Sequence, residues 1–115
     1  MVSVLHKIGP ASPWMEKLLP ALSSAVPSAD QPATPDGMSI PLHDLVPAGE
    51  EYYSYPGSLT YPPCTEGVKW FVMQSFPSIS RYQVAQLAQS LEGIPNTRPT
   101  QPLNDREILL KFSLP

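Results

Sequence analysis

Residues 51–73 read EYYSYPGSLTYPPCTEGVKWFVM, and this stretch decides the fold that the sequence predicts. Its first part, Glu51–Ser58, places three tyrosines at positions that favour a β-strand, before a Pro-Gly pair that is typical of a turn. In its last part, Val68–Met73, apolar side chains occupy both faces, which predicts a strand in the interior of a sheet. Between them, Thr60 stands in a turn made rigid by prolines. The stretch therefore predicts two strands joined by a proline-locked turn.

The residues that precede this stretch predict shorter elements. The alternation of polar and apolar residues over Met1–Ile8 predicts a strand. Ser12 followed by Pro13 is typical of a helix start, and Pro20 is expected to end or kink that helix. Residues 26–37, VPSADQPATPDG, predict a Pro-rich surface loop.

The residues that follow predict one helix and a last strand. Ser80 and Gln83 fit a capping box, and the apolar residues behind it have the spacing of an amphipathic helix that ends at Gly93. These apolar residues are Val84, Leu87, Ala88 and Leu91. Ile108–Phe112 predicts a terminal apolar strand. We therefore expect a mainly β protein with short helices, in the α+β class.

The composition excludes several functions. With 16 Pro and 6 Gly in 115 residues, most segments are interrupted before a long helix can form. The apolar runs are too short to cross a bilayer, so we expect no membrane span. Only 7 Lys and Arg residues are present and the net charge is −3, which argues against nucleic acid as a partner. The N-terminus lacks the pattern of a signal peptide, and the sequence predicts no compartment.

Few residues of the chain are candidates for catalysis or metal binding. A zinc site needs three or four converging ligands, whereas His6, His43 and Cys64 stand singly without a metal-binding spacing. We therefore expect no metal to bind this chain alone. Cys64 lacks a local base, so a structural or disulfide role is expected for it. Thr60, in contrast, offers a pre-oriented hydroxyl and a fixed backbone N–H, which suit recognition of an oxyanion.

Two strings in the chain resemble segments of the alpha-type carbonic anhydrases. YPGSLTYPPCTEGVKW (55–70) resembles that family's Y-x-G-S-L-T-T-P-P-C-x-E-x-V-x-W, and NTRPTQPLNDREI (96–108) resembles its N-x-R-x-x-Q-P-L-N-x-R. The resemblance extends over residues 1–115 and implies the C-terminal part of the domain, with a large, twisted, mostly antiparallel central sheet. The family's zinc-ligand histidines lie upstream of this part. The resemblance thus predicts a partial carbonic anhydrase domain over residues 1–115.

The resemblance implies roles for five residues. Thr60 matches the threonine whose hydroxyl accepts a hydrogen bond from the zinc-bound hydroxide and whose backbone N–H meets bicarbonate or an anionic inhibitor, so it is the expected catalytic residue. Leu59, Val68 and Trp70 match the apolar wall that holds carbon dioxide, and plain core packing is the alternative for Val68 and Trp70. Tyr61 replaces a second threonine, which predicts a narrower pocket mouth.

The same resemblance implies structural roles for other residues. The Pro62-Pro63 bond is expected to be cis, as in the corresponding turn of the family. Cys64 matches a cysteine that many secreted members pair with one near their N-terminus. Five polar residues are expected to tie loop carbonyls beneath the sheet: Asn96, Arg98, Gln101, Asn104 and Arg106.

The resemblance implies a carbonic anhydrase, a zinc lyase that interconverts carbon dioxide and bicarbonate. This chain would supply Thr60 and the apolar wall but no zinc ligand, so we expect it to be inactive alone and to self-associate through an exposed sheet edge. Carbon dioxide, bicarbonate and anionic inhibitors are the expected ligands of the completed domain. The alternative is a non-catalytic carbonic-anhydrase-like interaction module or a truncated remnant, whose loop 26–37 or tyrosine-rich strand binds a partner.

Overall fold

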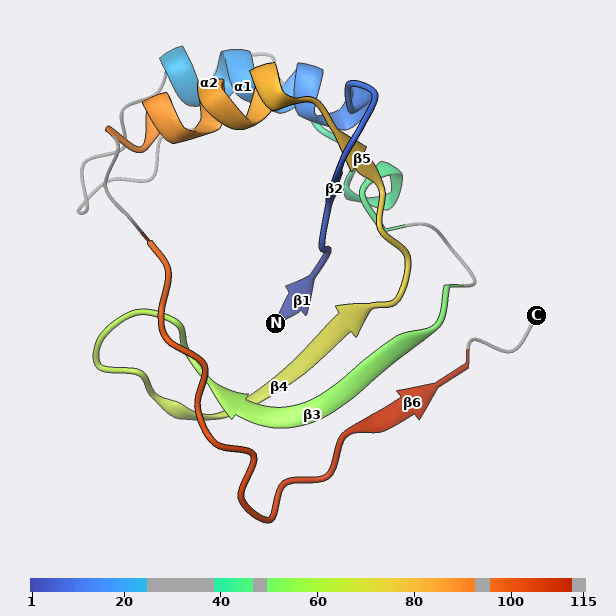
Figure 1. Cartoon of the computed structure of the whole chain (residues 1–115), viewed down its shortest axis with the longest axis vertical. Coiled ribbons are helices and arrows are strands. Elements are labelled where there is room, and N and C mark those ends of the chain that lie inside the picture. Colours follow the sequence, from blue (N-terminus) through green and yellow to red (C-terminus); the bar gives the residue numbers. More distant parts are fainter. Residues whose placement is uncertain (25–38, 47–49, 93–95, 113–115) are drawn as a thin grey trace. The chain divides into compact units, whose positions relative to one another are not determined.

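The computed structural model of the chain describes residues 1–24, 39–46, 50–92 and 96–112. In chain order, the elements are β1 (Val2–Ser3), β2 (Lys7–Ile8), α1 (Pro13–Ser24), the 3₁₀ helix η1 (Leu42–Asp44), β3 (Tyr52–Ser58), β4 (Glu66–Met73), β5 (Ser78–Ile79), α2 (Arg81–Ser90) and β6 (Leu109–Lys111) (Figure 1). The chain divides into two compact units. The first comprises residues 1–5, 46–76 and 95–115, and the second comprises residues 6–45 and 77–94.

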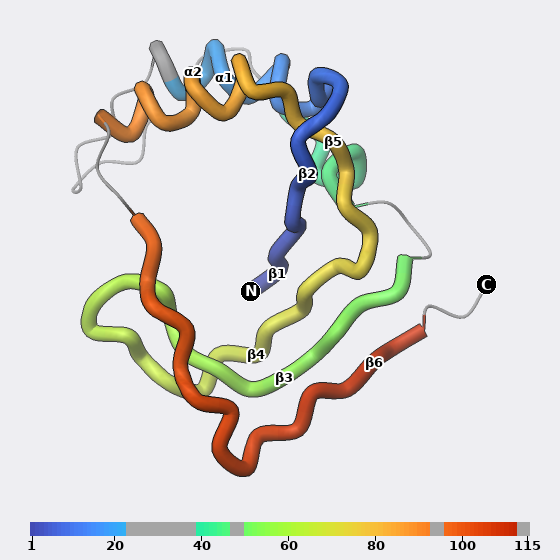
Figure 2. Tube along the Cα trace, in the orientation of Figure 1, coloured from blue at the N-terminus to red at the C-terminus, as the bar shows by residue number. Residues whose placement is uncertain are grey.

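The first unit holds a four-stranded sheet in the order β1-β4-β3-β6. Strand β3 is antiparallel to both β4 and β6, whereas β1 is parallel to β4. Figure 2 shows β4, β3 and β6 following one another across this sheet. Because β4 has a neighbour on each side, the prediction of an interior strand is confirmed. The mixed sheet with two helices also confirms the α+β class.

The expected turn at Pro56-Gly57 is wrong, because both residues belong to β3. Pro56 pairs with Lys69 and Gly57 pairs with Val68. The Pro56 carbonyl accepts a hydrogen bond of 3.0 Å from Arg106 Nη1. The Pro56 backbone therefore faces away from β4, where a missing N–H costs no bond of the ladder.

The expected single strand over Met1–Ile8 is also wrong. Val2 pairs with Phe71 of β4, whereas Lys7 pairs with Ser78 of β5 in a separate two-stranded parallel sheet of the second unit. The chain changes partner between the two pairs, so one continuous strand cannot satisfy both.

In the second unit, helix α1 continues through Pro20 to Ser24, so Pro20 does not end the helix, and the alternative that it kinks the helix stays a prediction. Proline removes one helical N–H donor. The flanking Leu19 and Ala21 are only 8% and 7% exposed, and their burial outweighs that loss. The core of this unit consists of Leu19, Met15 and Ile79.

Helix α2 begins with the predicted capping box, in which Ser80 and Gln83 bond each other's backbone N–H groups. The predicted buried face is partly wrong, because Gln83 is buried while Val84 and Leu91 are exposed. The reason is a contact that the apolar spacing does not reveal. Ser12 N–H donates to Gln83 Oε1 at 2.8 Å, and Gln83 Nε2 donates to the Ser12 carbonyl at 2.9 Å.

Two predicted positions fall outside the described residues, the Pro-rich loop at 26–37 and Gly93. Helix α2 itself ends at Ser90, with Leu91 as its C-cap. Within the described ranges, none of the helices has the length and apolar character needed to cross a membrane.

Candidate functional site

The turn that carries Thr60 joins β3 to β4. Leu59 N–H donates to the Thr65 carbonyl at 2.9 Å, and Cys64 N–H donates to the Tyr61 carbonyl at 2.8 Å. The Pro62-Pro63 bond is cis, as predicted. The turn is therefore closed by two backbone hydrogen bonds, one at its base and one at its tip.

Arg98 fastens the start of this turn from a segment forty residues further along the chain. Its Nη1 donates to Ser58 Oγ at 2.6 Å and to the Leu59 carbonyl at 2.9 Å. The expectation that Arg98 ties a loop carbonyl is thus confirmed.

Arg106 and Gln101 bind carbonyls in the same way. Arg106 donates to the carbonyls of Leu103, Pro56 and Pro102, and Gln101 Nε2 donates to that of Pro99 at 3.0 Å. Asn104 takes a positive φ of 50°. The bonding of Asn96 and Asn104 stays a prediction.

Trp70 is held against the end of β3. Its Nε1 donates to the Ser58 carbonyl at 3.0 Å. The ring lies so close to Gly57 that a Cβ there would be 2.7 Å from Trp70 Cδ1. Glycine at this position is therefore what lets the indole reach the strand backbone.

Thr60 and Trp70 line one hollow of about 390 Å³, together with Arg98 and Arg106. Thr60 is exposed and Trp70 is half-buried. Two arginines contribute to this wall, and none of the described residues that line it is acidic, a composition that favours an anion over a cation.

The other three predicted residues do not line this hollow. Val68 is half-buried and lines a neighbouring hollow of about 800 Å³. Leu59 is half-buried in the turn, and Tyr61 is 58% exposed. The structure thus joins Thr60 and Trp70 at one hollow, while the roles of all five residues stay predictions.

Sequence reasoning missed the contributions of Gly57 and Ser58. Gly57 was assigned to a turn, although it makes room for Trp70. Ser58 supplies both the hydroxyl bound by Arg98 and the carbonyl bound by Trp70. Both residues stand in the string that resembles the carbonic anhydrases, and that resemblance is the sequence feature that could have indicated their roles.

The metal-binding residue types do not converge. His43 is exposed, and its Nε2 lies 3.1 Å from Asp44 Oδ1, so the two side chains form a pair at the surface. In the part of the chain that the structure describes, no three His, Cys, Asp or Glu side chains form a group that could hold a metal ion. The described residues therefore do not fit a zinc site.

Comparison with known proteins gives a consistent family. The profile of the eukaryotic-type carbonic anhydrases matches residues 1–112. Carbonic anhydrase 1 of Mus musculus is 38% identical, with 97% of this chain and 45% of that protein aligned. The carbonic anhydrase of Pectobacterium carotovorum is 31% identical, with 95% of this chain and 43% of that protein aligned.

Solved structures agree with these sequence matches. The alpha-carbonic anhydrase of Thermovibrio ammonificans, in complex with the inhibitor sulfanilamide, superposes with a TM-score of 0.74 at 34% identity, over 93% of this chain and 45% of that one. The alpha-carbonic anhydrase of Photobacterium profundum gives a TM-score of 0.73 at 39% identity, over 93% and 46%. The chain thus spans less than half the length of each relative described.

Proposed function

Because this chain belongs to the eukaryotic-type carbonic anhydrase family, we propose that it supplies one part of a carbonic anhydrase active site, namely the Thr60 turn and the apolar wall beside it. In this proposal, residues 1–115 are the C-terminal part of the domain. The observation that carries it is the clamp of Arg98 on Ser58 and Leu59, which fixes the backbone directly before Thr60.

A fixed threonine has two uses at such a site. Its backbone N–H is a donor that needs no reorganisation when an anion arrives, and its hydroxyl accepts or donates one further hydrogen bond. The guanidinium groups in the same hollow favour bicarbonate or an anionic inhibitor over a cation. The Thermovibrio ammonificans enzyme was solved with sulfanilamide, and we assign the hollow beside Thr60 to the corresponding inhibitor site.

The apolar side chains near the turn suit the other substrate. Leu59, Val68 and Trp70 are all half-buried, so each keeps apolar surface available. Carbon dioxide is weakly polar and needs a dry surface more than hydrogen bonds. Tyr61, 58% exposed on the turn, narrows the mouth of this site.

Alpha carbonic anhydrases are zinc enzymes, and the described residues of this chain do not fit a zinc site. Catalytic zinc requires three protein ligands around an open position. Carbon dioxide hydration therefore needs ligands beyond those described, and we expect the chain alone to be inactive.

The test joins this chain to the N-terminal part of the Pectobacterium carotovorum carbonic anhydrase and measures carbon dioxide hydration. Thr60→Ala is expected to lower turnover by roughly 10²-fold, the lower end of the effect of removing one preorganised polar contact. Thr60→Ser keeps the hydroxyl and is expected to retain most of the activity. Thr65→Ala, the same truncation elsewhere in the turn, serves as the control.

The hydration rate and the unfolding midpoint of each variant together decide the outcome. The unfolding midpoint of each variant separates a loss of chemistry from a loss of folding. An active chimera in which Thr60→Ala matches the Thr65→Ala control would refute the role of Thr60. A correctly folded chimera without any activity would favour the non-catalytic interaction module.

A further inference from the structure

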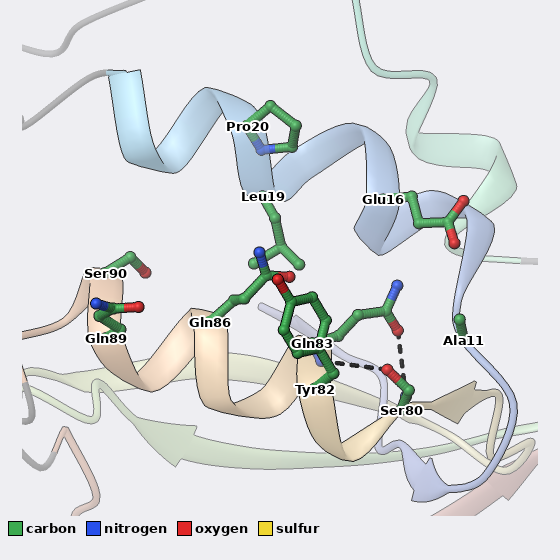
Figure 3. Close-up of a pocket in the computed structure, with 10 residues that line it drawn as sticks. All are labelled: Ala11, Glu16, Leu19, Pro20, Ser80, Tyr82, Gln83, Gln86, Gln89 and Ser90. Carbon is green, nitrogen blue, oxygen red and sulfur yellow. Dashed lines mark hydrogen bonds between the residues drawn. The ribbon is translucent and has the colours of Figure 1, made fainter.

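A second hollow lies in the other unit, between helices α1 and α2. It has a volume of about 590 Å³, within the range of small-molecule sites, roughly 300–1,000 Å³. Figure 3 shows Leu19 pointing from α1 toward α2, with Tyr82 and Gln86 rising from α2 toward α1. We call this hollow the α1–α2 groove. Since Thr60 belongs to the first unit, the groove is independent of the proposed active site.

The floor of the groove is rigid. Leu19 is 8% exposed and belongs to the core of the unit. Gln83 is 3% exposed; its Oε1 accepts hydrogen bonds from the Ser12 and Ser80 N–H groups, and its Nε2 donates one to the Ser12 carbonyl. The two helices are therefore fastened to each other beneath the groove, and Gln83 is scaffold rather than a ligand-binding group.

The rim of the groove carries polar side chains that make no hydrogen bond to another described residue. The side chains of Glu16, Gln86 and Gln89 line it, and within the described residues none of them makes a hydrogen bond. Each carboxamide offers two N–H donors and an acceptor oxygen, and the carboxylate offers acceptors only. This combination suits a neutral ligand whose groups both donate and accept, such as a set of hydroxyls.

Tyr82 adds an aromatic surface to the same rim. Its side chain is 72% exposed, a large exposed area for a residue that is amphipathic and usually half-covered. An exposed ring face beside amide groups suits a ligand that is apolar on one face and rich in hydroxyls around its edge. A sugar ring has this shape, whereas a phosphate would meet the carboxylate of Glu16 at a cost.

We propose that the α1–α2 groove binds a neutral saccharide. The carboxamides of Gln86 and Gln89 and the carboxylate of Glu16 bond its hydroxyls, and the ring of Tyr82 stacks on one face of the sugar. The ligand is either a free sugar or one unit of a longer glycan, since both present the same chemistry.

The test titrates the ¹⁵N-labelled full chain with glucose and with cellobiose, and follows the side-chain NH₂ signals of Gln86 and Gln89. Saturable shifts of both signals are expected with at least one of the sugars. Sorbitol, an acyclic polyol without a ring face, is expected to cause none at the same concentration. Tighter binding of cellobiose identifies a glycan as the ligand, and equal binding identifies a single sugar.

Variants, titrated in the same way but followed through the backbone N–H signals of α2, then assign the contacts. The double variant Gln86→Ala, Gln89→Ala is expected to weaken binding about tenfold, as two lost hydrogen bonds predict. Tyr82→Leu keeps apolar bulk without a ring and is expected to weaken it similarly. Arg81→Gln changes an exposed neighbour on α2 that does not line the groove, and is expected to leave affinity unchanged.

The same titration is run on the chimera with the Pectobacterium carotovorum part, so that the groove is examined in two contexts. The proposal is overturned if neither protein shows a saturable shift, if sorbitol acts as well as the sugars, or if the groove variants bind as tightly as Arg81→Gln. None of these results bears on the Thr60 measurement, which concerns a different unit.

Discussion

At the scale of single residues, the turn depends on a contact between a glycine and a tryptophan. The Trp70 ring lies so close to residue 57 that a Cβ there would be only 2.7 Å from Trp70 Cδ1. That position lets the indole N–H bond the Ser58 carbonyl, on the residue whose hydroxyl Arg98 binds. A side chain at position 57 would therefore disturb both hydrogen bonds that hold Ser58, the one from Trp70 and the one from Arg98.

Gly57→Ala is accordingly expected to lower the free energy of unfolding by about 1–3 kcal/mol, the usual cost of overpacking. Chemical denaturation, followed by far-UV circular dichroism so that the readout does not depend on Trp70, measures this change. In a Trp70→Leu background the same substitution loses its clash, so its cost is expected to fall close to zero. An equal cost in both backgrounds would mean that the Trp70 contact is not the cause.

Tyr61 allows a second prediction about the turn, made in the chimera. Tyr61→Thr enlarges the mouth without touching Thr60, so the affinities for bicarbonate and sulfanilamide are expected to shift more than turnover does. Inhibition assays and hydration rates on the same preparation give the comparison. If turnover collapses while inhibitor affinity stays constant, the residue-by-residue transfer from the family fails in this turn.

At the scale of elements, Gln83 connects the start of α2 to the start of α1. One carboxamide caps α2 through Ser80 and also satisfies both backbone groups of Ser12, although 71 residues separate Gln83 from Ser12. These groups are buried, so water cannot replace the amide when it is removed.

Gln83→Ala is therefore expected to destabilise the second unit by about 2–4 kcal/mol, because it removes the side-chain half of the capping box and leaves the buried Ser12 N–H unsatisfied, while the Ser12 carbonyl keeps its bond from Glu16 N–H. Gln89→Ala, an exposed truncation on the same helix, is expected to change stability by less than about 0.5 kcal/mol. Thermal unfolding of the two variants provides the comparison. Similar midpoints for both would show that the Ser12 contact contributes little.

The elements also show which features the sequence could predict. The capping box of α2 and the interior strand β4 follow from local patterns, and the sequence predicted both correctly. Pro20 and Pro56 were misread because each sits where tertiary contacts make the missing N–H tolerable, inside a packed helix and on the free side of β3. The burial of Gln83 was missed because its partner lies far away in the sequence.

The candidate site was predictable to a similar extent. The resemblance pointed to Thr60 and Trp70, which share a hollow in the structure. The resemblance predicted that Arg98 would bind a loop carbonyl, but not that this would be the Leu59 carbonyl directly before Thr60. Spacing alone cannot show that two segments about forty residues apart meet. The room that Gly57 makes for Trp70 likewise depends on strand register, which the sequence does not state.

At the scale of the whole molecule, little of the described chain is deeply buried. Five apolar residues are buried among those described: Met73 in the first unit, and Met15, Leu19, Ala21 and Ile79 in the second. In contrast, Leu109 and Leu110 of β6 are 46% and 40% exposed, and within the described residues β6 pairs with β3 on one side only. An apolar strand with an open edge is a template for pairing with another chain.

We therefore expect the isolated chain to self-associate through β6, and sedimentation velocity at increasing concentration to show growing species. Leu110→Lys places a charge on the open edge and is expected to shift the distribution toward monomer. Leu103→Lys, which changes an equally exposed leucine outside the strand, is expected to leave association unchanged. A concentration-independent monomer would show that this edge is protected in solution. An equal shift toward monomer with both lysines would mean that β6 is not the specific interface, because the change in net charge from −3 toward zero weakens self-repulsion and cannot itself favour the monomer.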